Sequence, residues 1–193
     1  MIGRISGILL EKHPPQVLID VQGLAYELDV PMSTFYQLPA TGSRTMLYTH
    51  FIVREDAQLL FGFATDGERH AFRQLVRISG IGARTALAVL SGMTVEELSQ
   101  TVAAQDSARL IRVPGIGRKT AERLLLEMKG KLVPEAASAS AEAGPSARDD
   151  ALSALLALGY SEKEVSAALN KLGPELTMAE TIRQALRLLS RVL

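Results

Sequence analysis

The chain has no cysteine, and only 5% of its 193 residues are aromatic. Without cysteine neither a disulfide framework nor a thiolate metal site can form, and the reducing cytoplasm is the simplest expected location. No uninterrupted apolar run approaches the roughly 20 residues that span a bilayer. The apolar stretch near the N-terminus is ended by Glu11 and Lys12 too soon for a signal peptide. We therefore expect a folded, soluble protein that does not associate with membranes.

Sequence signatures of catalysis are missing as well. The Gly-Lys pair at 130–131 is followed by Leu132, so the chain has no phosphate-binding loop of the ATPase type. The chain has three histidines, His13, His50 and His70, and they are not spaced like the ligands of a metal site. We expect no catalytic residues, no bound metal and no cofactor. A binding protein is favoured over a nuclease or an ATPase.

Positive charge is concentrated in the middle of the chain, although the formal net charge of the whole chain is zero. Residues 1–65 hold 4 basic and 6 acidic side chains, residues 66–133 hold 11 and 7, and residues 134–193 hold 6 and 8. The net charges of the three segments are therefore −2, +4 and −2. The middle segment is the part best suited to meet a polyanion.

The pattern of apolar residues changes near the same boundaries. In residues 1–65 apolar and polar residues alternate along five candidate strands, which suits a five-stranded OB-like β-barrel. A sandwich half or an SH3-like barrel stays open. Residues 66–133 have a helical period and predict an all-α domain. The expected fold class is therefore α+β with several domains.

The last third of the chain divides into a linker and a small helical domain. Residues 134–148 are rich in Ala, Ser, Glu, Gly and Pro with little to bury, which predicts a flexible linker. Residues 149–193 predict three short helices in a fold like that of ubiquitin-associated (UBA) domains. Leu158 and Tyr160 lie in the loop between the first two helices, and Leu189 lies on the last. These three side chains are candidates for a partner-binding surface.

An internal repeat is the most informative feature of the middle segment. RISGIGARTALAVL, at 77–90, matches RVPGIGRKTAERLL, at 112–125, with a constant offset of 35. In each copy a Gly-Ile-Gly turn precedes a helix whose first amides have no internal partner. Such a turn suits the approach of a phosphate, and nearby basic side chains strengthen it. The candidate DNA-binding residues are Gly80, Gly82 and Arg84 in the first copy and Gly115, Gly117, Arg118, Lys119 and Arg123 in the second.

A charged β-hairpin tip is predicted by HFIVREDAQLLFGF, at 50–63. Two adjacent carboxylates, Glu55 and Asp56, lie at the turn. They could be a catalytic pair, a metal site, solvated turn residues, or a device that acts on another charged body. A catalytic pair or metal site is disfavoured, because adjacent residues at a hairpin tip cannot easily converge on one atom and the turn itself holds no histidine or further carboxylate.

The repeats resemble tandem helix-hairpin-helix motifs, and the whole chain resembles the RuvA family of Holliday-junction-binding proteins. The resemblance rests on MIGRISG, THFIVREDAQLLFGF, SGIGARTALAVLSGM, VPGIGRKTAERL and ALGYSEKE, in that order. It implies a homotetramer or octamer that binds four-way DNA junctions without sequence preference. It further implies an acidic pin at Glu55 and Asp56, and a tail that docks on the RuvB hexameric ATPase. RuvC resolvase is a further candidate partner.

The function implied is that of a non-catalytic subunit that holds junctions open for branch migration in recombination and repair. The alternative is an OB-type protein that binds single-stranded nucleic acid through stacking aromatics. Tyr48, Phe51, Phe61 and Phe63 cluster enough in the sequence to keep that alternative open.

Overall fold

The computed structural model describes residues 1–129, 151–152, 154–156, 158–172 and 177–189. The chain separates into two compact units, Met1–Ala136 and Ala137–Leu193. The expected linker at 134–148 lies outside the described residues. Within the described residues, no helix is long and apolar enough to cross a membrane.

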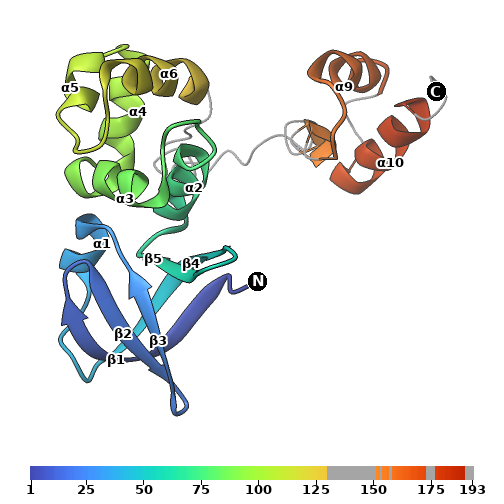
Figure 1. Cartoon of the computed structure of the whole chain (residues 1–193). Coiled ribbons are helices and arrows are strands. Elements are labelled where there is room, and N and C mark those ends of the chain that lie inside the picture. The colour runs from blue at the N-terminus through green and yellow to red at the C-terminus, as the bar shows by residue number, and fades with distance from the viewer. Residues whose placement is uncertain (130–150, 153, 157, 173–176, 190–193) are drawn as a thin grey trace. The chain divides into compact units, whose positions relative to one another are not determined.

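A closed five-stranded barrel forms the first part of unit one (Figure 1). Its strands follow one another around the barrel in the order β1-β2-β3-β5-β4, and β4 pairs with β1 to close it. Only the β3–β5 pair is parallel. The strands are β1 (Arg4–His13), β2 (Gln16–Val21), β3 (Leu24–Asp29), β4 (Arg44–Val53) and β5 (Gln58–Phe63). This arrangement confirms the expected OB-like barrel, in which closure leaves no long unpaired edge.

Apolar side chains at alternate positions of the strands point inward and fill the barrel. On β2, Val17 and Ile19 are buried while Gln16 and the partly buried Leu18 point the other way. A short helix, α1 (Met32–Gln37), follows β3 and lies between the barrel and the helices in Figure 1. The barrel core comprises Ile5, Leu9, Val17, Ile19, Leu28, Val30, Leu38 and Leu47.

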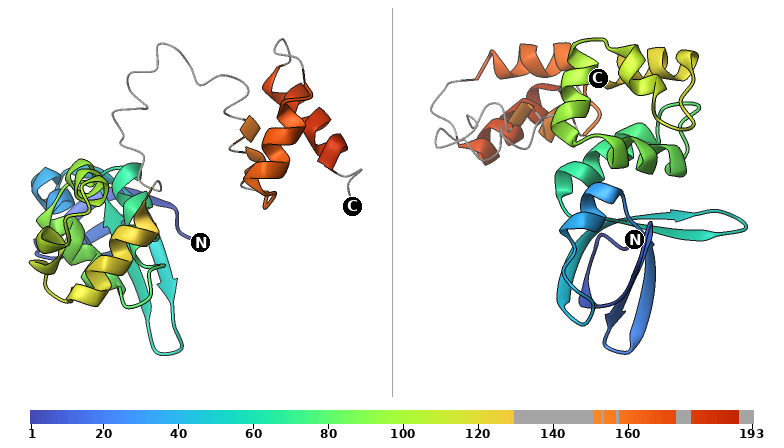
Figure 2. Two further views of the ribbon diagram at one scale, coloured as in Figure 1. Left: turned by 90° about the horizontal axis from the view of Figure 1, so that it is seen from above. Right: turned by 90° about the vertical axis from the view of Figure 1, so that its left-hand side faces the viewer.

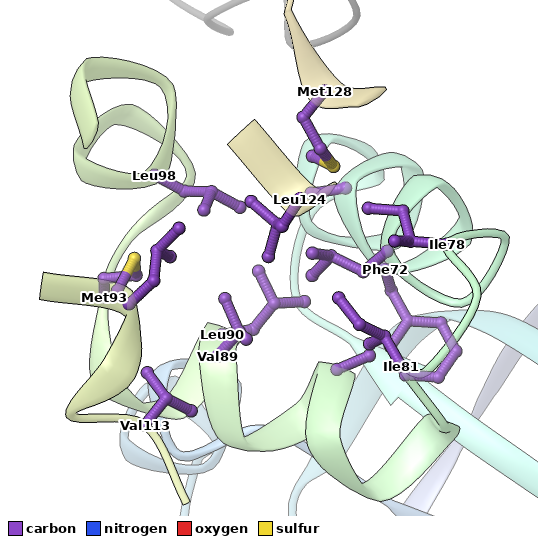
Figure 3. Close-up of a cluster of buried hydrophobic side chains, with 14 of the residues drawn as sticks. Phe72, Ile78, Ile81, Val89, Leu90, Met93, Leu98, Val113, Leu124 and Met128 are labelled. Carbon is purple, nitrogen blue, oxygen red and sulfur yellow. The ribbon is translucent and has the colours of Figure 1, made fainter. Parts of the chain in front are cut away.

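In the described residues of unit one, five further helices follow the barrel and share a core with it. They are α2 (Asp66–Leu75), α3 (Ala83–Gly92), α4 (Val95–Ala103), α5 (Ser107–Ile111) and α6 (Arg118–Met128). Phe72 of α2 contacts Phe61 and Phe63 of β5, with ring centroids 5.0 and 4.9 Å apart. From there the cluster continues through Leu90, Leu98 and Leu124, as Figure 3 shows. The all-α middle segment is therefore built directly on one wall of the barrel.

The second unit contains three helical segments in its described part. Residues 151–152 and 154–156 are helical, followed by α9 (Glu162–Leu169) and α10 (Met178–Leu189). Ala151, Leu155, Val165 and Ala185 are fully buried in a small core of their own. This agrees with the three helices expected for the tail.

Candidate nucleic-acid interface

The two Gly-Ile-Gly turns have the same geometry in the structure. Gly80 and Gly115 have φ values of +92° and +87°, in the left-handed region that a side chain rarely adopts. Gly82 and Gly117 are the N-caps of α3 and α6, with φ and ψ of −83° and 171° and of −89° and 170°. We call residues 80–84 and 115–119 the first and second corners. The sequence repeat is thus also a repeat of structure, with α2–α3 and α5–α6 as the two hairpins.

An isoleucine fixes each corner to the core. Ile81 and Ile116 are buried, with 4% and 5% of their surface exposed. The Ile81 amide donates to the Ile78 carbonyl at 3.0 Å, and the Ile116 amide donates to Val113 at 3.1 Å. Because the middle residue is held inward, the glycines on either side face outward. Both isoleucines thus anchor their turns in the core.

Each corner also contacts the other hairpin, which the sequence did not predict. A Cβ atom at Gly115 would lie 3.1 Å from Thr85 Oγ1, and one at Gly80 would lie 3.7 Å from Thr120 Oγ1. Thr85 and Thr120 occupy equivalent positions of the repeat, so each hairpin places its threonine against the other hairpin's glycine. The matched threonines in the sequence were a signal for this reciprocal contact. The spacing between the two corners is therefore fixed by direct contact.

Neither corner has a side chain that caps its helix. Gly82 and Gly117 provide no side-chain hydrogen bond to the first amides, and no acidic residue lies in the first turn of α3 or α6. A Cβ placed at either glycine would meet no heavy atom within 4 Å. Free amides, the positive end of the helix dipole and open space together favour an anionic ligand.

Basic side chains surround the corners unequally. Arg84 is exposed in the first turn of α3, while Arg118 and Lys119 are exposed in the first turn of α6. Arg118 Nε also donates to Glu122 Oε1 at 3.2 Å, which ties part of its charge to its own helix. The first corner thus has one cation where the second has two.

Arg123 has a different position from the other candidates. It is exposed on α6, and its Nη1 donates to the Ser79 carbonyl at 3.2 Å. That bond joins the helix of the second hairpin to the loop of the first. Arg123 therefore supports the contact between the hairpins and places a cation beside the first corner.

The acidic tip is the turn of a projecting hairpin. Arg54 N donates to the Ala57 carbonyl at 2.8 Å, and the exposed Glu55 and Asp56 lie between them. The pairing of β4 with β1 ends at Tyr48, and β5 pairs with β3 at Phe61, opposite His50, so beyond His50 the strands β4 and β5 pair only with each other. Figure 2 (right) shows this hairpin extending away from the barrel. In the described residues no three His, Asp or Glu side chains could together hold a metal ion.

Three of the four candidate stacking aromatics are not free to stack on bases. Phe61 and Phe63 are 1% and 0% exposed and pack on Phe72 beneath α2. Tyr48 is partly buried, with the Arg69 guanidinium 5.1 Å from its ring centroid. These are three of the four aromatic residues on which the single-strand alternative rested. All three pack in the core or against it.

In the second unit the three candidate partner residues differ in exposure. Leu158 is 63% exposed, Tyr160 is partly buried against the core, and Leu189 is only 8% exposed. Tyr160 and Leu189 line a shallow groove of about 330 Å³ together with Ala167, Ala168 and Leu188, and Glu164 and Lys171 lie at the same groove. Leu158 is thus an exposed apolar side chain, whereas Leu189 belongs mainly to the core.

A closed barrel carrying an acidic hairpin, joined to paired hairpins with anion-attracting corners, defines a multidomain protein of the tandem helix-hairpin-helix class. Three family models match the chain: RuvA N terminal domain at residues 1–62, SAM-like helix-hairpin-helix tandem at 72–129, and RuvA C-terminal domain at 146–190.

Similar proteins named Holliday junction branch migration complex subunit RuvA match along their whole length. The Bordetella avium protein is 62% identical, covering 99% of this chain and 100% of its own. The Nitrosospira multiformis protein is 61% identical over 99% of both chains, and the Nitrosomonas eutropha protein 60% over 100% of both. The chain belongs to the RuvA family.

Proposed function

We propose that this chain is the junction-binding subunit of a branch migration complex. It binds four-way DNA junctions by their structure, holds them open and loads the RuvB ATPase, in recombination and DNA repair. The observation that carries this proposal is the combination, in one compact unit, of two matched anion-attracting corners with a projecting acidic hairpin. The chain supplies binding and geometry, and the partner ATPase supplies the work.

The corners grip the sugar-phosphate backbone. Backbone amides of α3 and α6, with Arg84, Arg118 and Lys119, bind phosphates, and Arg123 adds charge beside the first corner. Contacts of this kind carry no base information, so binding is selective for structure and indifferent to sequence. The second corner has two cations in its first turn, whereas the first corner has Arg84 in its turn and Arg123 beside it.

The acidic tip acts by repulsion. When four subunits surround a junction, eight carboxylates from Glu55 and Asp56 gather near its centre. Like charges about 4 Å apart repel by roughly 1 kcal/mol in water and by more where protein excludes solvent. Phosphates at the crossover are pushed outward while the corners hold each arm, and this balance favours an open junction in which strands can change partners.

The assembly that this mechanism needs is a homotetramer, with an octamer formed when a second tetramer covers the other face of the DNA. The tail binds RuvB through Leu158, with Tyr160 and Leu189 at the adjacent groove, and RuvC resolvase is a second candidate partner. Because the substrate is chromosomal DNA, we place the protein in the cytoplasm.

Competition binding tests the proposal against the single-strand alternative. Labelled four-way junction is bound to the protein and challenged with unlabelled junction, duplex or single strand of equal nucleotide content. We expect the unlabelled junction to compete far better than duplex, and duplex better than single strand. Preferential competition by single strand would support the OB-type alternative and overturn the proposal.

A further inference from the structure

A buried carboxylate joins the barrel to the helices. Glu68, in the first turn of α2, is only 7% exposed. Its Oε1 accepts a hydrogen bond from Ser33 Oγ at 2.5 Å, and its Oε2 accepts from Thr34 Oγ1 at 2.6 Å and from the Ala64 amide at 3.0 Å. Thr34 is itself fully buried. One side chain of α2 therefore binds helix α1 and the end of β5 at once.

This carboxylate is not engaged in capping its own helix. The Thr65 side chain accepts from the Glu68 amide at 3.1 Å, as in a capping box. In a complete box the glutamate would turn back to the N-cap amide. Glu68 instead reaches across to α1, where Ser33 and Thr34 donate to it, and the Ala64 amide after β5 is its third donor. A buried carboxylate is tolerated only when it is satisfied in this way, so the contact demands one arrangement of the two elements.

Further polar contacts follow the same boundary on both sides of Glu68. The Met32 amide of α1 donates to Ser91 Oγ of α3 at 3.0 Å. Arg69 Nη1 donates to the Gly3 carbonyl at 2.7 Å. Together with Glu68 these bonds tie α1 and the N-terminal strand to α2 and α3. We call this set of contacts the seam.

The seam lies between the two parts that act on DNA. The strand β4, which leads to the acidic tip, contacts α2, since Arg73 Nε lies 3.3 Å from His50 Nδ1. Helix α3, which begins at the first corner, is joined to α1 through Ser91. Any rotation of the helices on the barrel would change the distance from the tip to the corners. It would also break the bonds of Glu68.

We propose that Glu68 is a positioning residue that sets the placement of the acidic tip relative to the two corners. This inference rests on the proposed function, in which tip and corners act on the same junction. Glu68 contacts no DNA in this account. It acts through α1 and α2, by holding repulsion and attraction at the separation that an open junction requires.

Three substitutions at the seam test this role. Glu68→Ala removes the acceptor of Ser33 and Thr34, whereas Thr34→Val removes one donor at nearly constant volume. Glu68→Gln is the conservative variant, because its carbonyl can still accept from Thr34 and Ala64 while its amide donates to the Ser33 hydroxyl. Thr101→Val is the matched control: Thr101 is equally buried, at 2% exposure, but bonds within α4 to the Glu97 carbonyl.

The readout is a distance rather than stability alone. The chain has no cysteine, so spin labels at Gln58→Cys beside the tip and Gln100→Cys on α4 are the only ones attached. Labelled full-length chain is diluted with unlabelled chain, so that pulsed electron paramagnetic resonance measures the distance between the two labels of one subunit. Junction and duplex affinities of the same seam variants are measured in parallel, with circular dichroism as the check on folding.

We expect Glu68→Ala and Thr34→Val to broaden or shift this distance distribution, while Glu68→Gln and Thr101→Val retain that of the parent. The preference for junction over duplex should fall about fivefold with the first two variants, with duplex affinity unchanged. The proposal is overturned if Glu68→Ala folds and keeps the parent's distance distribution and its preference for junction over duplex. If Glu68→Ala does not fold, the same two results in folded Thr34→Val overturn the proposal. It is also overturned if Thr101→Val changes the distance distribution and the junction preference as much as Thr34→Val does.

Failure of the proposed function gives a different pattern. If Glu55→Gln with Asp56→Asn leaves junction preference intact, the tip does not act on the junction, whatever the spin labels report. If that double variant loses preference but the seam variants alter neither distance nor preference, the function stands and the positioning role of Glu68 is wrong.

Discussion

Glycine serves two different purposes at each corner. Gly80 and Gly115 provide positive φ values, so they are required for the turn itself. Gly82 and Gly117 have ordinary extended backbone and open space where a side chain would lie, so they are not required for folding. Their value in the proposed function is access, because a bare backbone allows a phosphate close to the amides.

This difference predicts opposite outcomes for two alanine variants. Gly115→Ala should destabilise the protein by about 1–2 kcal/mol from the left-handed backbone alone, and by more because its Cβ would press on Thr85 at 3.1 Å. Gly117→Ala should change stability little but weaken junction binding, because its methyl group occupies the phosphate's approach. Urea unfolding and fluorescence anisotropy measure the two effects. A large loss of stability in Gly117→Ala with unchanged affinity would contradict this reading.

Lys119 allows a test of the charge contact at the second corner. If it neutralises one phosphate, Lys119→Gln should reduce the slope of log affinity against log salt by about 0.9 and weaken all junction sequences alike. Lys129→Gln is the matched control, since Lys129 is exposed at the opposite end of α6. Equal slopes for both variants, or a loss that depends on sequence, would exclude this role for Lys119.

Sequence reasoning reached the corner residues because the repeat marks them twice. It did not find the contact of Thr85 with Gly115, although both threonines were visible in the repeat, because periodicity does not show which hairpin faces which. It also missed Glu68. Thr65 and Glu68 have the spacing of a local cap, and nothing in the sequence indicates that the carboxylate turns to a helix more than 30 residues earlier.

At the scale of elements, the contact between α2 and β4 depends on a neutral histidine. Burial lowers the pKa of His50, and the guanidinium groups of Arg73, Arg69 and Arg77 lower it further. The neutral Nδ1 can accept from Arg73 Nε, and a protonated ring cannot. The unfolded chain therefore binds the proton more readily than the folded one.

The sign of the pH effect follows from that difference. The stabilising contribution of neutral His50 should be fully present above its unfolded pKa of about 6.5 and should be lost as pH falls through the folded value. His50→Gln should remove this part of the pH dependence, whereas His13→Gln, at an exposed position, should not. Urea unfolding between pH 7.5 and 5 measures it. A parent-like pH dependence in His50→Gln would show that another group is responsible.

Elements were predicted from the sequence more completely than their contacts. Alternation identified the strands, and the hairpin tip at Glu55 and Asp56 follows from two apolar runs on either side of charged residues. The barrel could not be distinguished from a sandwich or an SH3-like barrel, because closure depends on β4 pairing with β1. Nor did the sequence show that Phe61 and Phe63 serve the helical core, since strand alternation does not identify what covers each face.

At the scale of the whole molecule, two units with separate cores allow binding to DNA and to the motor to be tested separately. Leu158→Ala removes an exposed side chain and should weaken RuvB binding without affecting folding or junction affinity. Leu189→Ala should destabilise the tail by about 2–5 kcal/mol, because it leaves a cavity in a small core. Calorimetry measures the stability of each variant, and a RuvB pull-down measures its binding to RuvB. Normal RuvB binding by Leu158→Ala would remove Leu158 from the docking surface.

In the proposed mechanism, attraction at the corners and repulsion at the tip together hold a junction open. The most direct measurement is single-molecule fluorescence resonance energy transfer between dyes on two arms of the junction. The junction is bound either by the parent chain or by the tip variant, which carries both Glu55→Gln and Asp56→Asn. The control is Glu11→Gln, Glu96→Gln, which removes the same charge from exposed sites away from the tip. We predict an open junction with parent and control, and a bound but less open one with the tip variant. A fully open junction with the tip variant would contradict the account.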